Sequence, residues 1–164
     1  MSALMNLREV FGLAIQIESN GAAFYRKAAA GQKNAAARAY LEELAGMEDE
    51  HKRVFTEMRK LALAAHKEGA EELRPEGGLF LAAVMDGFSV EGSPSVADKL
   101  TGRENLTRLL EVAVDLEKQA ILFYLGLKDA MAGREAKAQL DRIIREEKAH
   151  VITLTAALRN RRQA

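Results

Sequence analysis

The sequence contains no cysteine and no tryptophan, only two prolines and few aromatic residues. The absence of cysteine excludes disulfides, thiol catalysis, iron–sulfur clusters and any four-cysteine iron or zinc site within these residues. Charge of one sign is also lacking, because 24 basic residues balance 24 acidic ones. A protein that depends on nucleic acid usually carries a basic excess, so we expect no nucleic-acid partner.

Long apolar runs are missing as well. The longest, Leu79 to Met85, is far shorter than the roughly 20 residues that a membrane-spanning helix needs, so we expect no membrane partner. The N-terminus lacks the apolar region of a signal peptide, which makes a cytoplasmic location the expectation. At 164 residues, we expect one domain spanning 1–164.

What is abundant is alanine, leucine, glutamate, lysine and arginine, a composition that favours helix over strand. Apolar periodicity predicts four long helices at about 6–30, 34–66, 105–131 and 134–160. Asn6, Asn34 and Asn105 are expected helix starts, and Gly31 an expected stop. The short loops within each pair predict two antiparallel hairpins, joined by a long crossover at about 67–104. We therefore expect an all-α four-helix bundle, with short extra helices at Leu79–Phe88 and Ser95–Leu100 in the crossover.

A six-residue pattern occurs twice, 99 residues apart. Glu18, Phe24, Tyr25, Leu41, Glu48 and His51 recur as Glu117, Phe123, Tyr124, Leu140, Glu147 and His150. Each copy ends in a Glu-x-x-His step, whose two side chains lie on one face of a helix. The same offset carries the first expected helix onto the third and the second onto the fourth.

The acids of this repeat lie on the apolar stripes of the helices rather than on their charged faces. The expected stripes are Leu7, Phe11, Ile15, Glu18, Ala22 and Tyr25; Leu41, Leu44, Glu48, His51, Phe55 and Met58; Leu106, Leu110, Val114, Glu117, Ile121 and Tyr124; and Leu140, Ile143, Glu147, His150 and Leu154. Burying one unpaired carboxylate costs several kcal/mol, so four would cost on the order of 10–20 kcal/mol. A whole domain is stable by only roughly 5–15 kcal/mol.

The buried acids must therefore be protonated or compensated by cations, and no lysine or arginine lies on these stripes. Two metal ions would compensate them, with each histidine binding through one ring nitrogen. The predicted ligands are Glu18, Glu48, His51, Glu117, Glu147 and His150. Glu146 is ambiguous because it lies four residues before His150, but the register of the repeat selects Glu147.

Several neighbouring residues are open to two interpretations. Tyr25 and Tyr124 either hydrogen-bond a metal-binding carboxylate across the bundle or close the core with the hydroxyl on another partner. Gly21 interrupts the first helix, which either a close helix approach or the need for room beside the site would explain. His66 lies outside the repeat, and we expect it to be exposed or to interact with a helix C-terminus.

In its Glu, Glu-x-x-His, Glu, Glu-x-x-His pattern over all four helices, the chain resembles the ferritin-like di-iron carboxylate proteins, and most closely the rubrerythrins. The resemblance implies a ferritin-like bundle with two iron ions per chain, manganese or zinc being alternatives. It implies that Glu18 and His51 serve one ion and Glu117 and His150 the other, with Glu48 and Glu147 shared. No catalytic residue beyond these ligands is implied.

Two features depart from the rubrerythrin pattern. The chain lacks the C-terminal rubredoxin-like four-cysteine site, so electrons would come from a separate donor protein. It also has Ala120 where rubrerythrins carry a further carboxylate on the third helix, and Gly21 at the mirror position.

Three functions remain open from the sequence. The first is an oxidoreductase that reduces hydrogen peroxide or dioxygen, in keeping with a role in oxidative stress. The second is ferritin-like oxidation, storage or transfer of iron, and the third is a non-enzymatic protein with structural metal ions. The apolar residues of the crossover predict a homodimer.

Overall fold

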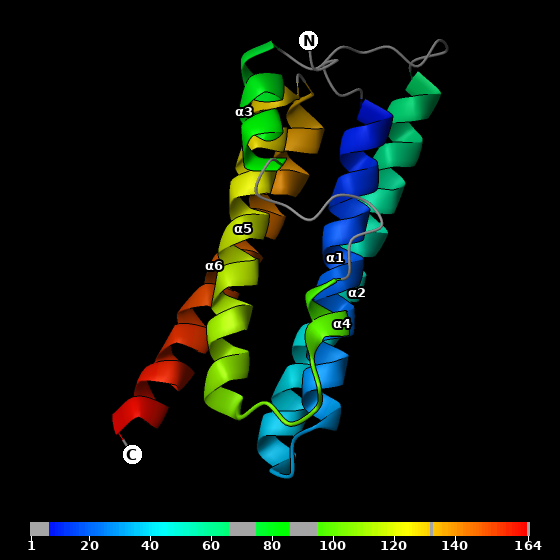
Figure 1. The fold of residues 1–164 in the computed structure, drawn as a ribbon. Coiled ribbons are helices and arrows are strands. Elements are labelled where there is room, and N and C mark those ends of the chain that lie inside the picture. The colour runs from blue at the N-terminus through cyan, green and yellow to red at the C-terminus, as the bar shows by residue number, and fades with distance from the viewer. Residues whose placement is uncertain (1–6, 66–74, 86–94, 132, 164) are drawn as a thin grey trace.

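The computed structural model describes residues 7–65, 75–85, 95–131 and 133–163. Within these ranges the chain is helical and contains no strand. Four long helices pair as two hairpins that run side by side, which is the all-α bundle expected from the sequence (Figure 1). No helix in the described ranges is both long enough and apolar enough to cross a membrane.

The first hairpin joins α1 (Leu7–Ala30) to α2 (Ala35–Ala65). The Asn34 side chain accepts a hydrogen bond from the backbone N–H of Ala37 at 2.9 Å, which satisfies an otherwise unpaired donor at the start of α2. The predicted end of α1 at about Ala30 agrees with the structure, and α2, predicted to continue to about residue 66, is described up to Ala65. Asn6, the predicted start of the first helix, and His66, predicted to be exposed or near a helix C-terminus, lie outside the described residues.

The second hairpin joins α5 (Leu106–Ala130) to α6 (Arg134–Gln163). Asn105 is the expected N-cap of α5, and its side chain accepts from the backbone N–H of Arg108 at 2.9 Å. Met131 ends α5 in an extended conformation. Helix α6 continues to Gln163, slightly beyond the predicted end at residue 160, and its last turn carries Arg161 and Arg162, whose charge favours a helix C-terminus.

Two short helices lie in the crossover between the hairpins. Helix α3 (Pro75–Met85) packs along α5, and α4 (Val96–Lys99) packs on α1 (Figure 1). The prediction of a helix at Leu79–Phe88 was wrong about its start: the helix begins at Pro75, which suits a first helical position because its missing N–H needs no partner there. Phe88 lies outside the described residues. Helix α4 lies within the predicted range Ser95–Leu100, with Ser95 as its N-cap, Leu100 as its C-cap and Asp98 completing a capping box.

Two apolar clusters fill the bundle, one toward each end. One includes Phe11, Phe55, Phe123, Leu140 and Ile143, and the other includes Phe24, Leu41, Leu44, Leu110 and Leu154. On each long helix, the charged residues of the repeat fall between the stretches that supply these two clusters. The fold therefore encloses a polar layer between two apolar cores.

The predicted stripes mostly face this interior, with a few departures. Ile15, Leu106 and Ile121 are only partly buried, whereas Ala14, Ala113 and Ala120 are buried. The inward seam of α1 and α5 therefore lies slightly to one side of the predicted stripe, and includes small residues that a search for large apolar side chains overlooks. The burial of Leu7 is not described.

Candidate metal centre

The polar layer consists of six side chains, supplied by all four long helices. They are the buried polar or charged residues found in the described part of the chain, and each has at most 4% of its surface exposed. They are Glu18 from α1, Glu48 and His51 from α2, Glu117 from α5, and Glu147 and His150 from α6. The structure thus brings together all six residues that the sequence predicts as metal ligands.

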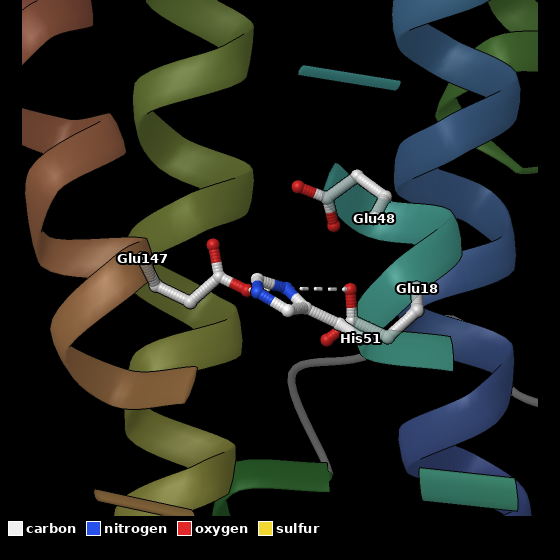
Figure 2. Close-up of side chains that lie close together, drawn as sticks. All are labelled: Glu18, Glu48, His51 and Glu147. Carbon is white, nitrogen blue, oxygen red and sulfur yellow. Dashed lines mark ion pairs between the residues drawn. The ribbon is translucent and has the colours of Figure 1, made fainter. Parts of the chain in front are cut away.

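These side chains form two overlapping groups whose ligand atoms lie within 4.8 Å of one another. The first group is Glu18, Glu48, His51 and Glu147, and the second is Glu48, Glu117, Glu147 and His150. Figure 2 shows the first group, with the imidazole of His51 between Glu147 and Glu18. Glu48 and Glu147 belong to both groups, which is the grouping that the family resemblance implied; binding of a metal by these residues stays a prediction.

Glu147 lies at the centre of the cluster. Its Oε1 is 2.8 Å from Nδ1 of His51, and its Oε2 is 2.8 Å from Nδ1 of His150. The two imidazole rings are stacked with their centroids 6.1 Å apart. One carboxylate therefore faces both halves of the site, as a ligand shared by two ions would.

Several buried polar atoms of the cluster make no hydrogen bond, and the contacts that Glu147 makes with the two imidazoles are ion pairs. Among the described residues, all but one of the buried side-chain nitrogen and oxygen atoms without a hydrogen-bond partner belong to this cluster. They are Glu18 Oε2, Glu48 Oε1, His51 Nδ1, both carboxylate oxygens of Glu147, and His150 Nδ1. Buried polar groups are nearly always satisfied. Carboxylate oxygens and imidazole nitrogens are also common iron, zinc and manganese ligands, so the residues fit two metal ions.

In the metal-free protein, the histidines carry part of the compensating charge. Burial lowers the pKa of His51, but the carboxylates of Glu147 and Glu18 outweigh it and raise this pKa to about 11. Burial likewise opposes, and Glu117 and Glu147 favour, protonation of His150, whose pKa rises to about 9. A metal ion that binds here must therefore displace protons.

The carboxylates divide according to their surroundings. Burial raises the pKa of Glu48 well above its usual value, and the charges of Glu18 and Glu147 act in the same direction. Burial also raises the pKa of Glu117 to about 7, against the effect of His150. Burial also acts to raise the pKa of Glu147, but the two nearby imidazoles outweigh it and lower this pKa to about 2. Glu147 is thus the acid most firmly held in its ionised form.

Two tyrosines connect the hairpins through hydrogen bonds to the cluster. The Tyr25 hydroxyl on α1 donates to Glu117 Oε1 on α5, and the Tyr124 hydroxyl on α5 donates to Glu18 Oε1 on α1. Burial raises the pKa of both phenols, and the adjacent carboxylates raise it further, so both stay protonated donors. The sequence left two interpretations of these tyrosines open. In the structure, each hydroxyl makes the hydrogen bond to a carboxylate of the predicted site.

The structure also places residues to which the sequence gave no clear role. Glu146 Oε2 lies 2.8 Å from His51 Nε2, on the side of the ring away from the cluster. Gly21 lies against Glu48, since a Cβ atom there would be 2.9 Å from Glu48 Oε2. Room beside the site is therefore the explanation for this glycine. Glu50 and Glu111 form ion pairs with arginines near the surface and take no part in the cluster.

Comparison with known proteins defines the class of fold. No protein-family model matches the sequence, and no curated protein matches it in sequence. A solved structure from Thermotoga maritima, described as that of a candidate ferritin-like diiron-carboxylate protein, superposes with a TM-score of 0.76. The match covers 97% of this chain and 98% of that one, at 24% sequence identity. The chain therefore has the ferritin-like fold, and its buried glutamate–histidine cluster is compatible with a two-metal site.

Proposed function

We propose that this protein is a di-iron oxidoreductase of the rubrerythrin type, which reduces hydrogen peroxide or dioxygen with electrons from a separate donor protein. The observation that carries the proposal is the pair of buried groups that share Glu48 and Glu147. Four carboxylates and two imidazoles suit ions that alternate between ferrous and ferric states, because anionic oxygen ligands compensate the added charge.

The roles of the side chains follow from their contacts. Glu18 and His51 would hold one ion, Glu117 and His150 the other, and Glu48 and Glu147 both. Two iron ions supply two electrons, the number needed to convert hydrogen peroxide and two protons into two molecules of water. Tyr25 and Tyr124 hold one oxygen each of Glu117 and Glu18, which orients these carboxylates and leaves their other oxygens for the ions.

Partners belong to the same proposal. These 164 residues include no cysteine for a rubredoxin-like centre, and the donor proposed here is a separate protein. A homodimer is supported by the apolar side chains of Leu79, Phe80 and Leu122, which are exposed on α3 and α5. Ala120 adds no carboxylate to the cluster, which supports a plainer six-residue site than in rubrerythrins.

The test is reaction of the diferrous protein with hydrogen peroxide under anaerobic conditions, followed by rapid-mixing absorption. We expect about two irons per chain and oxidation faster than that of free ferrous ion at the same concentration. Glu147→Ala should abolish both iron binding and the reaction, whereas Glu42→Ala, at an exposed position of α2, should change neither.

Other results would favour the alternatives. Iron uptake far beyond two ions per chain, in a large assembly, would favour storage. A protein that binds zinc and iron equally well, and whose iron reacts no faster than the free ion, would favour a structural role for the metals.

A further inference from the structure

Among the residues that contact the two imidazoles, one pair of equivalent positions differs in residue type between the halves of the cluster. The 99-residue offset that relates the two Glu-x-x-His steps also relates Met47 to Glu146, which immediately precede Glu48 and Glu147. Each residue contacts the imidazole of the opposite hairpin. Glu146 Oε2 is 2.8 Å from Nε2 of His51, and Met47 Sδ is 3.4 Å from Nε2 of His150.

These contacts act on the nitrogen that faces away from the cluster. In both histidines Nδ1 faces the acids of the cluster, so Nε2 is the nitrogen that remains for an outer partner. A carboxylate only accepts a hydrogen bond, so Glu146 requires the hydrogen of His51 on Nε2 and leaves the lone pair of Nδ1 free for a metal ion. A thioether is a weak acceptor and imposes the same tautomer on His150 far less strongly.

A second contact, which holds Glu146 in place, is also present in only one half of the cluster. Arg142, one turn earlier on α6, places Nε 3.3 Å from Glu146 Oε1 and so holds the carboxylate in place. The residue equivalent to Arg142 is Glu43, which is exposed on α2. The first hairpin therefore lacks both the carboxylate and the cation that positions it.

Most of the other contacts of the two halves are similar, although Glu147 Oε1 lies 2.8 Å from Nδ1 of His51 and the equivalent Glu48 Oε1 lies 3.7 Å from Nδ1 of His150. Tyr25 and Tyr124 donate to Glu117 and Glu18 in the same way, and Glu147 lies 2.8 Å from both imidazoles. Gly21 and Ala120 also differ, but Gly21 adjoins Glu48, which belongs to both groups. Because Glu48 and Glu147 belong to both groups, the outer partner is the difference in residue type that acts on one imidazole alone.

From this we infer that the two metal positions are inequivalent: Glu146 makes the position beside His51 the tighter one, which fills first, and Met47 leaves the position beside His150 the weaker, exchangeable one. The inference rests on the metal binding in the proposed function. A carboxylate behind a ligating histidine raises the basicity of the imidazole, and loss of such a partner typically weakens metal binding about 10–100-fold. Glu146 is a positioning residue, because it acts on the ion through His51.

The test is titration of the metal-free chain with Co(II) in competition with a chelator, followed by visible absorption. The wild-type protein should bind two ions in two steps of unequal affinity. Glu146→Met should weaken the tighter step about 10–100-fold and leave the other nearly unchanged, which brings the two steps together. The double variant Glu43→Arg, Met47→Glu should instead strengthen the weaker step. Lys148→Met, at an exposed position on α6, is the control and should alter neither.

Nuclear magnetic resonance of the zinc-loaded protein supplies a readout independent of affinity. His51 should show a slowly exchanging proton on Nε2, and this protection should be lost in Glu146→Met and largely kept in Glu146→Gln, whose amide oxygen still accepts. Circular dichroism checks that each variant keeps its helices. Should Glu146→Met lose them, Glu146→Gln takes its place, with a smaller loss expected in the same step.

The outcomes separate this inference from the proposed function. Equal wild-type steps, or equal weakening of both steps by the Glu146 variants, would overturn the inference even if the diferrous protein consumes peroxide rapidly. Unequal steps that shift as described would sustain it even if peroxide is not reduced. Failure to bind any metal would overturn both.

Discussion

Gly21 and Glu48 are in contact across the first hairpin, because the absence of a side chain on α1 leaves room for a carboxylate from α2. A Cβ atom at Gly21 would lie 2.9 Å from Oε2 and 3.3 Å from Cδ of Glu48. Glu48 belongs to both of the groups proposed to bind metal, so this glycine leaves room for a side chain that both proposed ions would share.

Gly21→Ala should therefore separate stability from metal binding. In the metal-free protein, alanine favours the helix by about 1 kcal/mol, and movement of the Glu48 side chain offsets part of this gain. Metal affinity should fall, because the carboxylate is displaced from both ions. Gly12→Ala, on the same helix with nothing within 4 Å of the new Cβ, should stabilise without changing affinity. Thermal unfolding and Co(II) titration of both variants check this, and unchanged affinity in Gly21→Ala would contradict it.

The reciprocal tyrosine hydrogen bonds predict a second pair of variants. Tyr25→Phe and Tyr124→Phe each remove a donor from a buried carboxylate, a loss of about 1–3 kcal/mol in the free energy of unfolding. Because the two contacts are equivalent, the two variants should lose similar amounts. Tyr40→Phe is the matched control, since its hydroxyl pairs with Thr153 at an exposed position. Urea unfolding measures all three, and a loss in Tyr40→Phe as large as in the others would refute the role given to the buried hydroxyls.

Much of the fold could be predicted because local signals and the periodicity of the core agree. Asn34 and Asn105 each begin a long helix in the structure as in the prediction, since an Asn side chain satisfies an N–H group that the helix leaves unpaired. Helix α3 was harder, because Gly77 and Gly78 argue against a helix there. Their cost is outweighed by close packing: a Cβ at Gly77 would lie 2.5 Å from Cα of Ala130 on α5.

The candidate site divides in a similar way. The positions of Glu18, Glu117 and the two Glu-x-x-His steps follow from spacing on single helices, which the sequence shows directly. The contact of Glu146 with His51 depends instead on how the second hairpin is rotated against the first. The spacing of residues along α6 gives no information about that rotation. The sequence therefore leaves the role of Glu146 ambiguous and does not indicate a contact between Met47 and His150.

The packing of α3 on α5 gives a prediction about stability alone. Gly77→Ala would place a Cβ within 2.7 Å of three atoms of Ala130, two of them backbone atoms that cannot move aside cheaply. Overpacking of this kind typically costs about 1–3 kcal/mol. Gly46→Ala on α2, with nothing within 4 Å, should be neutral or slightly stabilising. Urea unfolding measures the loss, and Co(II) affinity should stay unchanged in both, since neither glycine adjoins the cluster; weaker binding in Gly77→Ala would show that α3 supports the site.

The histidine pKa values predict how stability depends on pH without metal. In the folded protein the pKa values of His51 and His150 are raised to about 11 and 9, from 6.5. The folded state thus binds more protons than the unfolded state above pH 6.5, and this contribution to stability is lost as the pH rises through these values. The pKa of Glu117, raised from 4.5 to about 7, acts in the same direction at lower pH. The metal-free protein should become less stable as the pH rises from about 6 to 9.

Metal ions should offset this trend, because they bind the deprotonated ligands and gain affinity as protons leave. The rise in melting temperature on adding zinc should therefore increase with pH over the same range. Parallel melting curves with zinc and with a chelator measure it. His51→Ala should flatten the metal-free dependence, because it removes the group with the largest upward shift among the histidines. A metal-free protein whose stability is constant or increases over this range would show that the imidazoles do not carry the compensating charge.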